Sequence, residues 1–299
     1  METGCTLCPR ACGVDRGRQT GRCKSGSAMR IARAALHHWE EPPLSGERGS
    51  GAIFFTGCPL GCVYCQNGEI SRLENPGREI SPKALCGIMQ ALVEQGAHNI
   101  NLVTPTHFVP QIREALMLYK PPVPVVYNSS GYERVETLRS LSGLVDIYLP
   151  DFKYAESALA KVLSQAEDYP QAALAAIKEM VEQAGAPVCD EKGIMQKGVL
   201  IRHLILPGEV ENALDAIVWV QESFPPKTVL LSLMGQYLPC GRAKQMPGLD
   251  RPLLEEEQHR VEEYLLCSGF EDGYLQELSS ASEEYIPDFH LQGVEHAEK

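Results

Sequence analysis

Short apolar segments typical of buried strands alternate with helical segments over most of this chain, and no other feature restricts its fold as much. The predicted strands are 51–56, 100–103, 123–127, 145–149, 199–206 and 228–233. Helices are predicted over 82–95, 108–119, 133–141 and 210–222, with two more inside 156–184 that are broken near Pro170. Strands joined by helical crossovers pair in parallel. We therefore expect an α/β fold, a partial (β/α)6 TIM-like barrel rather than a closed eight-fold one.

Three regions are expected along the chain. Residues 1–45 form a Cys-rich, metal-binding segment, 46–240 the partial barrel, and 241–299 a helix over 253–267, a short strand near 274–277 and an acidic tail. A short helical stretch is predicted just before His37 and His38, which we interpret as packing or surface residues rather than metal ligands.

Charge and cysteine content narrow the class of protein. The 299 residues carry a net charge of −12, and such an acidic surface argues against binding to nucleic acid. Residues 1–39 are basic, with seven Lys or Arg against two Asp or Glu, which we interpret as offsetting thiolates rather than contacting an acidic protein. No apolar run approaches the ~18 residues of a membrane helix, and no signal peptide is evident. A cytoplasmic protein is expected, in which eleven cysteines indicate metal binding rather than disulfides.

Three of these cysteines, Cys58, Cys62 and Cys65, follow the first predicted strand directly. A short loop at a strand end can turn three sulfurs toward one point, and Gly57 and Gly61 permit the tight backbone that this needs. Three thiolates are one fewer than the four that usually hold an iron–sulfur cluster, so one iron would stay open to a further ligand. A zinc knuckle and chance clustering in a Cys-rich chain are the alternatives.

A second set of cysteines, Cys5, Cys8, Cys12 and Cys23, lies in a segment with little apolar content. So short a segment could hardly fold by burial alone, and this favours a fold organised by a metal. Four thiolates suit zinc and an iron–sulfur cluster equally. The sequence does not separate the two.

Polar residues follow the other predicted strands. In α/β barrels the functional groups lie at the carboxyl ends of the strands. An Asp there can meet an ammonium group, a Lys or Arg a carboxylate, and Asn or Ser the hydroxyls of a ribose. The strand ends therefore predict a site for a zwitterionic, ribose-bearing ligand at Thr104–His107, Asn128–Ser130, Asp151–Lys153, Arg202–His203 and Ser232–Gln236.

Several of these motifs resemble one family. The spacing of Cys58, Cys62 and Cys65, with Tyr64 just before the last of them, resembles the cluster motif of the radical S-adenosylmethionine (SAM) superfamily. Segments 128–131, 151–153, 202–208 and 231–237 resemble successive motifs of glycyl-radical-enzyme activases, whose type member is the pyruvate formate-lyase activating enzyme. The four N-terminal cysteines and residues 37–42 narrow the resemblance further. With them, essentially the whole chain is similar to the branch called pyruvate formate-lyase activating enzyme-like iron–sulfur proteins.

The resemblance implies a ligand set. Cys58, Cys62 and Cys65 would hold a 4Fe–4S cluster whose open iron is chelated by the amino and carboxylate groups of SAM, and Tyr64 would lie near the adenine. Further candidates for binding SAM are Thr104, Asn128, Ser130, Asp151, Lys153 and Arg202. Three positions depart from the pattern. Thr104-Pro105-Thr106 replaces a Gly-Gly-Glu that receives the amino group, Asn128 replaces an acid, and Gln236 stands near an expected His.

The resemblance also implies an activity, a radical SAM oxidoreductase that works without oxygen. Reduced by a flavodoxin- or ferredoxin-like donor, the enzyme would cleave SAM to methionine and a 5′-deoxyadenosyl radical, which installs a glycyl radical on a partner enzyme. One alternative is modification of another peptide or a small molecule, with an auxiliary cluster on the N-terminal cysteines. Another is a non-enzymatic metal-binding scaffold. Gln236 is a catalytic candidate, and Cys240 is a candidate radical relay for which a packing or surface role is favoured.

Overall fold

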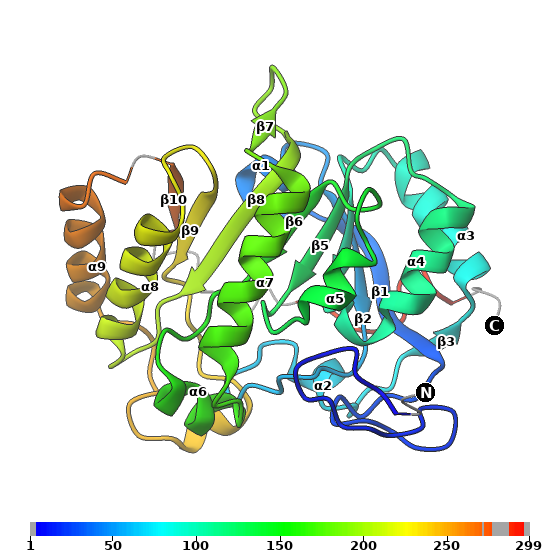
Figure 1. The fold of residues 1–299 in the computed structure, drawn as a ribbon, viewed down its shortest axis with the longest axis horizontal. Helices are drawn as coiled ribbons and strands as arrows, with labels where there is room; N and C mark the ends of the chain where they lie inside the picture. Colours follow the sequence, from blue (N-terminus) through cyan, green and yellow to red (C-terminus); the bar gives the residue numbers. More distant parts are fainter. Residues whose placement is uncertain (1–3, 271, 277–286, 296–299) are drawn as a thin grey trace.

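The computed structural model describes residues 4–270, 272–276 and 287–295. Within these ranges one sheet runs in the order β10-β9-β8-β6-β5-β4-β2-β1-β3, and β7 pairs with β8 beside this path (Figure 1). The strands are β1 (Met29–His37), β2 (Ser50–Phe55), β3 (Arg78–Ile80), β4 (Ile100–Val103), β5 (Val125–Ser129), β6 (Ile147–Pro150), β7 (Val188–Cys189), β8 (Met195–Leu204), β9 (Leu230–Met234) and β10 (Gly273–Gln276).

The six predicted strands form the middle of this sheet. β2, β4, β5, β6, β8 and β9 pair in parallel in that order, which confirms an α/β fold with a mostly parallel sheet. β10, from the C-terminal segment, adds a further parallel strand beside β9. At the other edge β1 is antiparallel to β2 and β3 is antiparallel to β1. β10 and β3 are the two ends of the path, so the sheet stays open as in a partial barrel.

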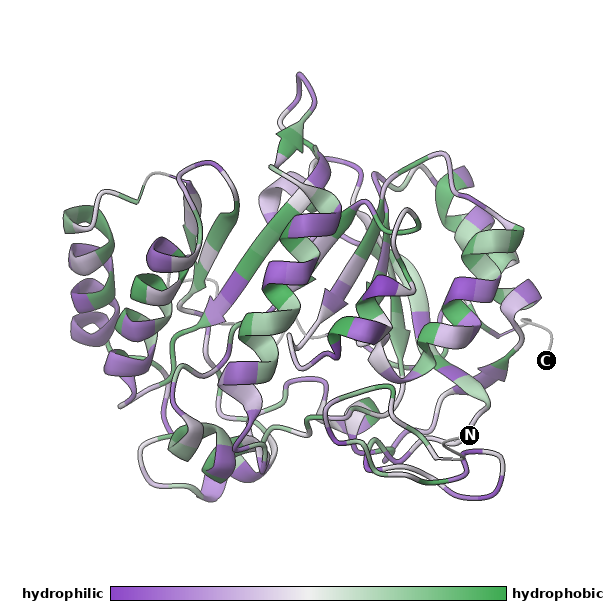
Figure 2. Ribbon diagram, viewed as in Figure 1, coloured by the Kyte–Doolittle hydropathy of each residue, from purple (hydrophilic) through white to green (hydrophobic). Residues whose placement is uncertain are grey.

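Helices α3, α4, α5, α7 and α8 connect the parallel strands and cover one face of the sheet, with α9 beside α8 (Figure 1). Figure 2 shows strongly apolar strands behind helices that carry polar bands on their outer surface. The helices of the described residues are α1 (Pro42–Ser45), α2 (Gly68–Ser71), α3 (Pro82–Glu94), α4 (Val109–Leu118), α5 (Val135–Arg139), α6 (Ser157–Ser164), α7 (Tyr169–Ala184), α8 (Val210–Ser223) and α9 (Glu255–Cys267). None of them combines the length and apolar character needed to cross a membrane.

One local prediction is wrong, and another is confirmed. The stretch before His37 is not helical, because residues 31–37 of β1 pair with β2 and Ile31, Ala32 and Ala34 are buried. Tertiary pairing here overrides the helical preference of an Ala- and Arg-rich segment. The two helices predicted inside 156–184, broken near Pro170, are confirmed: Gln165 ends α6 in the left-handed conformation (φ 52°), and α7 begins at Tyr169. Pro170 sits in the first turn of α7, where its missing N–H costs no helical hydrogen bond.

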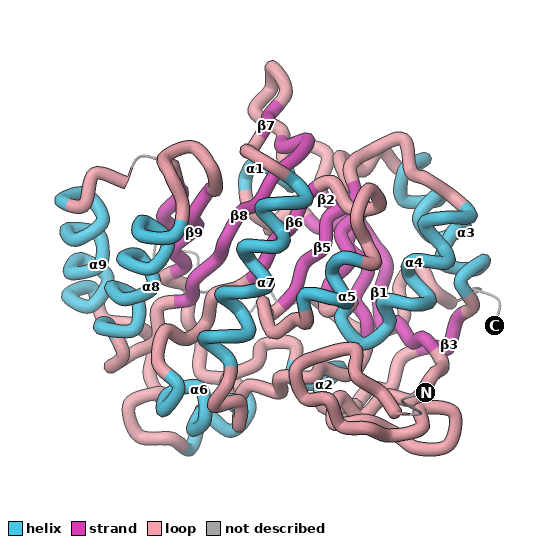
Figure 3. The backbone as a smooth tube through the Cα atoms, viewed as in Figure 1, coloured by secondary structure: helices cyan, strands magenta, loops and turns pink. Residues whose placement is uncertain are grey.

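Residues 4–28, which precede β1, form loops without helix or strand (Figure 3). These loops lie at the lower edge of the sheet in Figure 1, beside α2 and α6, where the parallel strands have their carboxyl ends. Residues 277–286 and 296–299 of the predicted acidic tail lie outside the described residues.

Candidate functional site

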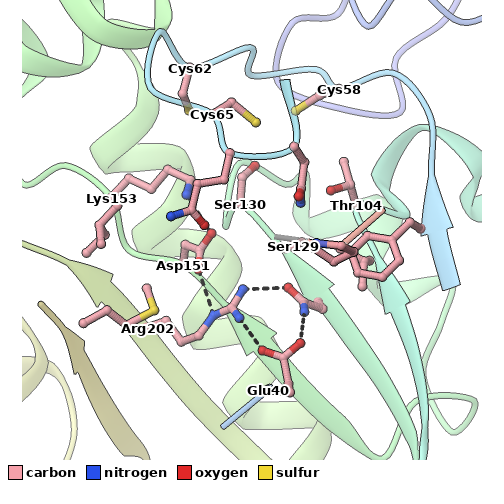
Figure 4. A pocket seen from close by; sticks show the side chains of 18 of the residues that line it. Glu40, Cys58, Cys62, Cys65, Thr104, Ser129, Ser130, Asp151, Lys153 and Arg202 are labelled. Carbon is pink, nitrogen blue, oxygen red and sulfur yellow. Dashed lines mark hydrogen bonds and ion pairs between the residues drawn. The ribbon is translucent and has the colours of Figure 1, made fainter. Parts of the chain in front are cut away.

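A cavity of about 250 Å³ opens at the carboxyl ends of the parallel strands. The loop between β2 and α2, which carries the three cysteines, closes one end of it, and the ends of β4, β5, β6 and β8 form part of the remaining wall (Figure 4). Every residue predicted at the cluster and SAM site borders this cavity: Cys58, Cys62, Cys65, Tyr64, Thr104, Asn128, Ser130, Asp151, Lys153, Arg202 and Gln236.

The cysteine loop is shaped by close backbone contacts. Gly57 has a φ of +82°, and a Cβ there would lie 2.6 Å from the carbonyl oxygen of Cys23, so no other residue fits this turn. Each sulfur accepts a hydrogen bond: Cys62 from Ser164 Oγ at 3.1 Å, Cys58 from the N–H of Leu60 at 3.4 Å, and Cys65 from Ser71 Oγ at 3.5 Å. Such bonds stabilise anionic sulfur.

The electrostatics of the loop favour a bound cation. Burial raises the pKa of Cys58 to about 12, and the neighbouring thiols of Cys65 and Cys62 add to this effect. Burial and Cys62 likewise raise the pKa of Cys65. Three clustered sulfur donors that need positive charge fit a 4Fe–4S cluster.

Across the cavity, Arg202 joins three parts of the chain. Its Nε donates to Asp151 Oδ1 at 2.9 Å, one terminal nitrogen to Glu40 Oε1 at 2.7 Å and the other to Asn128 Oδ1 at 2.7 Å (Figure 4). The amide of Asn128 also donates to Glu40 Oε2 at 3.1 Å. Both ends of the Asn128 side chain are thus held by protein groups, and this residue orders the site.

Asp151 and Lys153 bridge this network and the cysteine loop. Lys153 Nζ lies 2.7 Å from Asp151 Oδ2. Burial opposes the ionisation of Asp151, but Arg202 and Lys153 outweigh it and hold the pKa of the carboxyl below its ordinary value. Burial likewise disfavours the charged form of Lys153, but the nearby carboxylate of Asp151 outweighs this effect, and the pKa of Lys153 is raised. Both side chains are therefore charged within the cavity, and the pair offers one group of each sign to a zwitterion.

Thr104 occupies the wall in a strained conformation. Its φ is +60°, a left-handed value that is unfavourable for a β-branched residue. Thr106, two residues on, is buried and turned away, with Oγ1 donating to Glu133 Oε1 at 2.5 Å. Of the Thr104-Pro105-Thr106 segment, only Thr104 borders the cavity.

Glu40 and Glu41 are cavity residues that sequence reasoning missed. Both follow β1, and Glu41 is buried, accepting hydrogen bonds from Ser232 Oγ at 2.9 Å and from Gln276 Nε2 at 3.2 Å. Burial raises the pKa of Glu41 to about 7, with Arg202 opposing the shift. The motif over residues 37–42 was recognised in the sequence, but nothing there placed it opposite the cysteine loop. His37 and Trp39 border the cavity as well.

Other strand-end residues lie elsewhere. His107 and His203 are buried, with ring nitrogens 2.8 Å from Thr56 O and 2.6 Å from Phe152 O respectively, and neither borders the cavity. Cys240 is also outside the cavity wall. Gln236 borders it, and its buried Oε1 has no hydrogen-bond partner among the described residues. An unpartnered buried acceptor in a cavity wall points to a ligand.

Comparisons with known proteins agree with this geometry. The model of the radical SAM superfamily matches residues 52–220, more than half of the chain. The uncharacterized protein MJ0674 of Methanocaldococcus jannaschii is 29% identical over 262 residues, which cover 85% of this chain and 71% of that protein.

Two solved structures share the fold. They are SuiB of Streptococcus suis bound to the precursor peptide SuiA and SuiB bound to S-adenosylmethionine, with TM-scores of 0.51 and 0.52 and 14% sequence identity. The match covers 76% of this chain, and the chain spans about half the length of SuiB (48% and 50%). The chain belongs to the radical SAM superfamily, whose members bind a 4Fe–4S cluster and SAM.

Proposed function

We propose that the protein binds a 4Fe–4S cluster through Cys58, Cys62 and Cys65, binds SAM in the adjoining cavity, and catalyses hydrogen abstraction from a polypeptide substrate. The observation that carries this proposal is the placement of three cysteines on one loop facing Asp151 and Lys153 across a single cavity. Three thiolates leave one iron of a cubane open, and the paired charges beside it suit the amino and carboxylate groups of SAM.

When bound, the cluster supplies one electron to the sulfonium of SAM, whose cleavage gives methionine and a 5′-deoxyadenosyl radical. The chain's own residues bind and orient. Lys153 offers its ammonium to the carboxylate of SAM and Asp151 its carboxylate to the amino group, while Ser130 and Tyr64 line the side proposed for ribose and adenine. Arg202, Glu40 and Asn128 hold Asp151 in place through the hydrogen bonds described above. Gln236 would use its unpartnered Oε1 toward the bound nucleoside.

The activation of a glycyl-radical enzyme is the first proposed activity, in which the hydrogen comes from a backbone glycine of the partner. The motifs at residues 128–131, 151–153, 202–208 and 231–237 support it. A flavodoxin- or ferredoxin-like protein would supply the electron.

Modification of another peptide is the second proposed activity. The replacement of Gly-Gly-Glu by a segment that offers only Thr104 to the cavity favours it, because the activase pattern is lost at the position that receives the amino group of SAM. The shared fold with SuiB, solved with its precursor peptide SuiA, is compatible with a peptide substrate.

The test of the proposed site uses anaerobically reconstituted protein. Wild type reduced in the presence of SAM should release 5′-deoxyadenosine and methionine in equal amounts, and the Cys58→Ala/Cys62→Ala/Cys65→Ala variant should release neither and lose about four irons. A Cys189→Ala/Cys267→Ala variant removes two exposed cysteines outside the site and should behave as wild type. Retention of all iron in the triple variant would refute the assignment.

The two activities differ in one spectroscopic result. A glycyl-radical activase yields a persistent glycyl signal in electron paramagnetic resonance only when its partner enzyme is present. A modified peptide, formed while no glycyl signal appears, would decide for the second activity.

A further inference from the structure

We propose that Cys5, Cys8, Cys12 and Cys23 hold a second iron–sulfur cluster, in direct contact with the loop that carries Cys58. These residues lie outside the segment matched by the superfamily, which begins at residue 52. The proposal rests on the function proposed above only for the identity of the neighbouring centre.

The segment around these cysteines is folded without a core of its own. In residues 4–28 the buried side chains are Cys8, Cys23 and Ser25, with 8%, 6% and 4% of their surface exposed. No apolar side chain of the segment reaches that degree of burial, and the structure gives the region no helix or strand. All four cysteines are free of disulfides. A stretch of 25 residues whose buried side chains are two thiols and a serine hydroxyl lacks the apolar burial that holds small folds together, and a bound metal centre can stabilise such a segment.

Backbone hydrogen bonds bring the four cysteines together. The N–H of Cys5 donates to the carbonyl of Val14 at 2.9 Å, and the N–H of Gly13 donates back to the carbonyl of Cys5 at 3.1 Å. Between these two bonds the chain turns at Ala11, whose φ is +37° and whose N–H donates to Cys8 O at 3.0 Å. Cys5, Cys8 and Cys12 therefore lie on one closed loop.

Gly21 leaves a space that sulfur fills. A Cβ built on Gly21 would lie 3.2 Å from Cys12 Sγ and 3.4 Å from Cys23 Sγ. The two sulfurs converge on a position where the chain has no side chain, so Cys23 joins the loop formed by the first three cysteines. The N–H of Lys24 donates to Gly21 O at 2.9 Å and closes this second turn. The sulfurs of Cys12 and Cys23 thus border a space that any side chain larger than glycine's would narrow.

We assign an iron–sulfur cluster rather than zinc to this donor set because of what lies beside it. Four thiolates suit zinc and an iron–sulfur cluster equally. The hydrogen bond between Cys23 and Cys58 favours the iron–sulfur cluster, because a redox-active centre in such contact can exchange electrons with its neighbour, whereas zinc has no redox chemistry. Arg10, Arg16 and Arg22 lie in the same segment and supply positive charge near a thiolate-bound, anionic centre.

The second site touches the first. The N–H of Cys58 donates to the carbonyl oxygen of Cys23 at 3.3 Å, so one proposed ligand of each centre is hydrogen-bonded to the other. Arg10 adds a second connection, donating from Nε to Pro59 O at 3.0 Å and from a terminal nitrogen to Leu60 O at 3.3 Å. Two one-electron centres on ligands in such contact interact electronically, and their unpaired spins interact when both are reduced.

The first experiment measures iron, sulfide and zinc in anaerobically reconstituted full-length protein. Wild type should hold about eight irons and eight sulfides, and Cys5→Ala/Cys8→Ala about four of each. The Cys58→Ala/Cys62→Ala/Cys65→Ala variant should also keep about four, because the N-terminal site is intact there. The Cys189→Ala/Cys267→Ala variant is the matched control and should keep all eight. One zinc per wild-type chain, absent from Cys5→Ala/Cys8→Ala, would overturn the proposal.

The outcomes separate the two assignments. If the N-terminal proposal fails, Cys5→Ala/Cys8→Ala keeps the iron of wild type, whereas failure of the proposed SAM site leaves iron unchanged in the triple variant. The triple variant does not alter the N-terminal segment. The iron that it retains therefore shows whether this segment holds a cluster, even if Cys5→Ala/Cys8→Ala misfolds.

Electron paramagnetic resonance tests the contact between the centres. Fully reduced wild type should show broadened, split signals that sharpen in either cluster variant. A wild-type spectrum equal to the sum of the two variant spectra would refute the contact.

Discussion

Arg202 and Glu40 form an ion pair at 2.7 Å although 162 positions separate them in the chain. The pair connects the end of β8 to the segment that follows β1. Asp151 and Asn128 also accept hydrogen bonds from Arg202 and complete this polar network. The segment that follows the antiparallel strand β1 therefore contributes directly to the proposed SAM site.

Glu40→Gln should lower the free energy of unfolding by about 2 kcal/mol, because it leaves a buried guanidinium with one carboxylate instead of two. Only 14% of the Arg202 side chain and 10% of the Glu40 side chain are exposed. Thermal unfolding of the anaerobic protein measures the effect. Glu136→Gln removes an exposed partner of Arg134 and should leave the midpoint unchanged. Equal midpoints for both variants would show that the network contributes nothing to stability.

Replacement of Thr104 should stabilise the protein. We expect Thr104→Gly to be the most stable of the three proteins, Thr104→Ala to be intermediate and wild type to be the least stable. The φ of +60° at this position strains a β-branched side chain most and glycine least, and relief of such strain is worth about 1 kcal/mol. Urea unfolding of the three proteins checks the order. Thr137 has ordinary helical geometry within α5, so Thr137→Gly should destabilise. A loss of stability in Thr104→Gly would show that the conformation is unstrained.

Glu133→Gln should become more stable relative to wild type as the pH rises from about 5 to about 8. Burial raises the pKa of the Glu133 carboxyl from 4.5 to about 7 in the folded protein, with Thr106 and Tyr127 opposing the shift. Between these two values the folded chain holds a proton that the unfolded chain has lost. The contribution of Glu133 to stability therefore falls as the pH rises through this window, by on the order of 3 kcal/mol.

The difference in melting temperature between Glu133→Gln and wild type, measured across this pH range, checks this sign. Glu41, whose pKa also shifts to about 7, is present in both proteins, so its contribution cancels in the difference. Glu114→Gln, at an exposed position of α4, should differ from wild type by the same amount at every pH. A constant difference for Glu133→Gln would contradict the raised pKa.

Ser164→Ala should make the cluster at Cys58, Cys62 and Cys65 harder to reduce. Ser164 Oγ donates to Cys62 Sγ at 3.1 Å, and hydrogen bonds to cluster sulfurs raise the reduction potential. Loss of about 1 kcal/mol corresponds to a downward shift on the order of 40 mV for one electron. A redox titration followed by electron paramagnetic resonance measures it. Ser157→Ala, at the other end of α6, serves as the control and should leave the potential unchanged.

Much of the fold could be predicted because its signals are local. The strand Ile100–Val103 and the helix Pro82–Glu94, capped by Ser81, follow from short apolar runs, helical spacing and a capping residue. The order of the parallel strands follows from the same alternation. β1 could not be recognised in this way, because a segment rich in Ala and Arg becomes a strand only when β2 is there to pair with it.

The sequence by itself determined which chemical groups the protein carries at its strand ends: three cysteines spaced for a cluster, an Asp and Lys two residues apart, and an Arg on the following strand. Covalent spacing and the parallel connection of strands suffice for that. Only the tertiary structure decided that Glu40 and Glu41 face the same cavity, that Thr106 turns away toward Glu133, and that Cys23 contacts Cys58. Those relationships join residues distant in the chain, and packing and burial, rather than local sequence, bring such residues together.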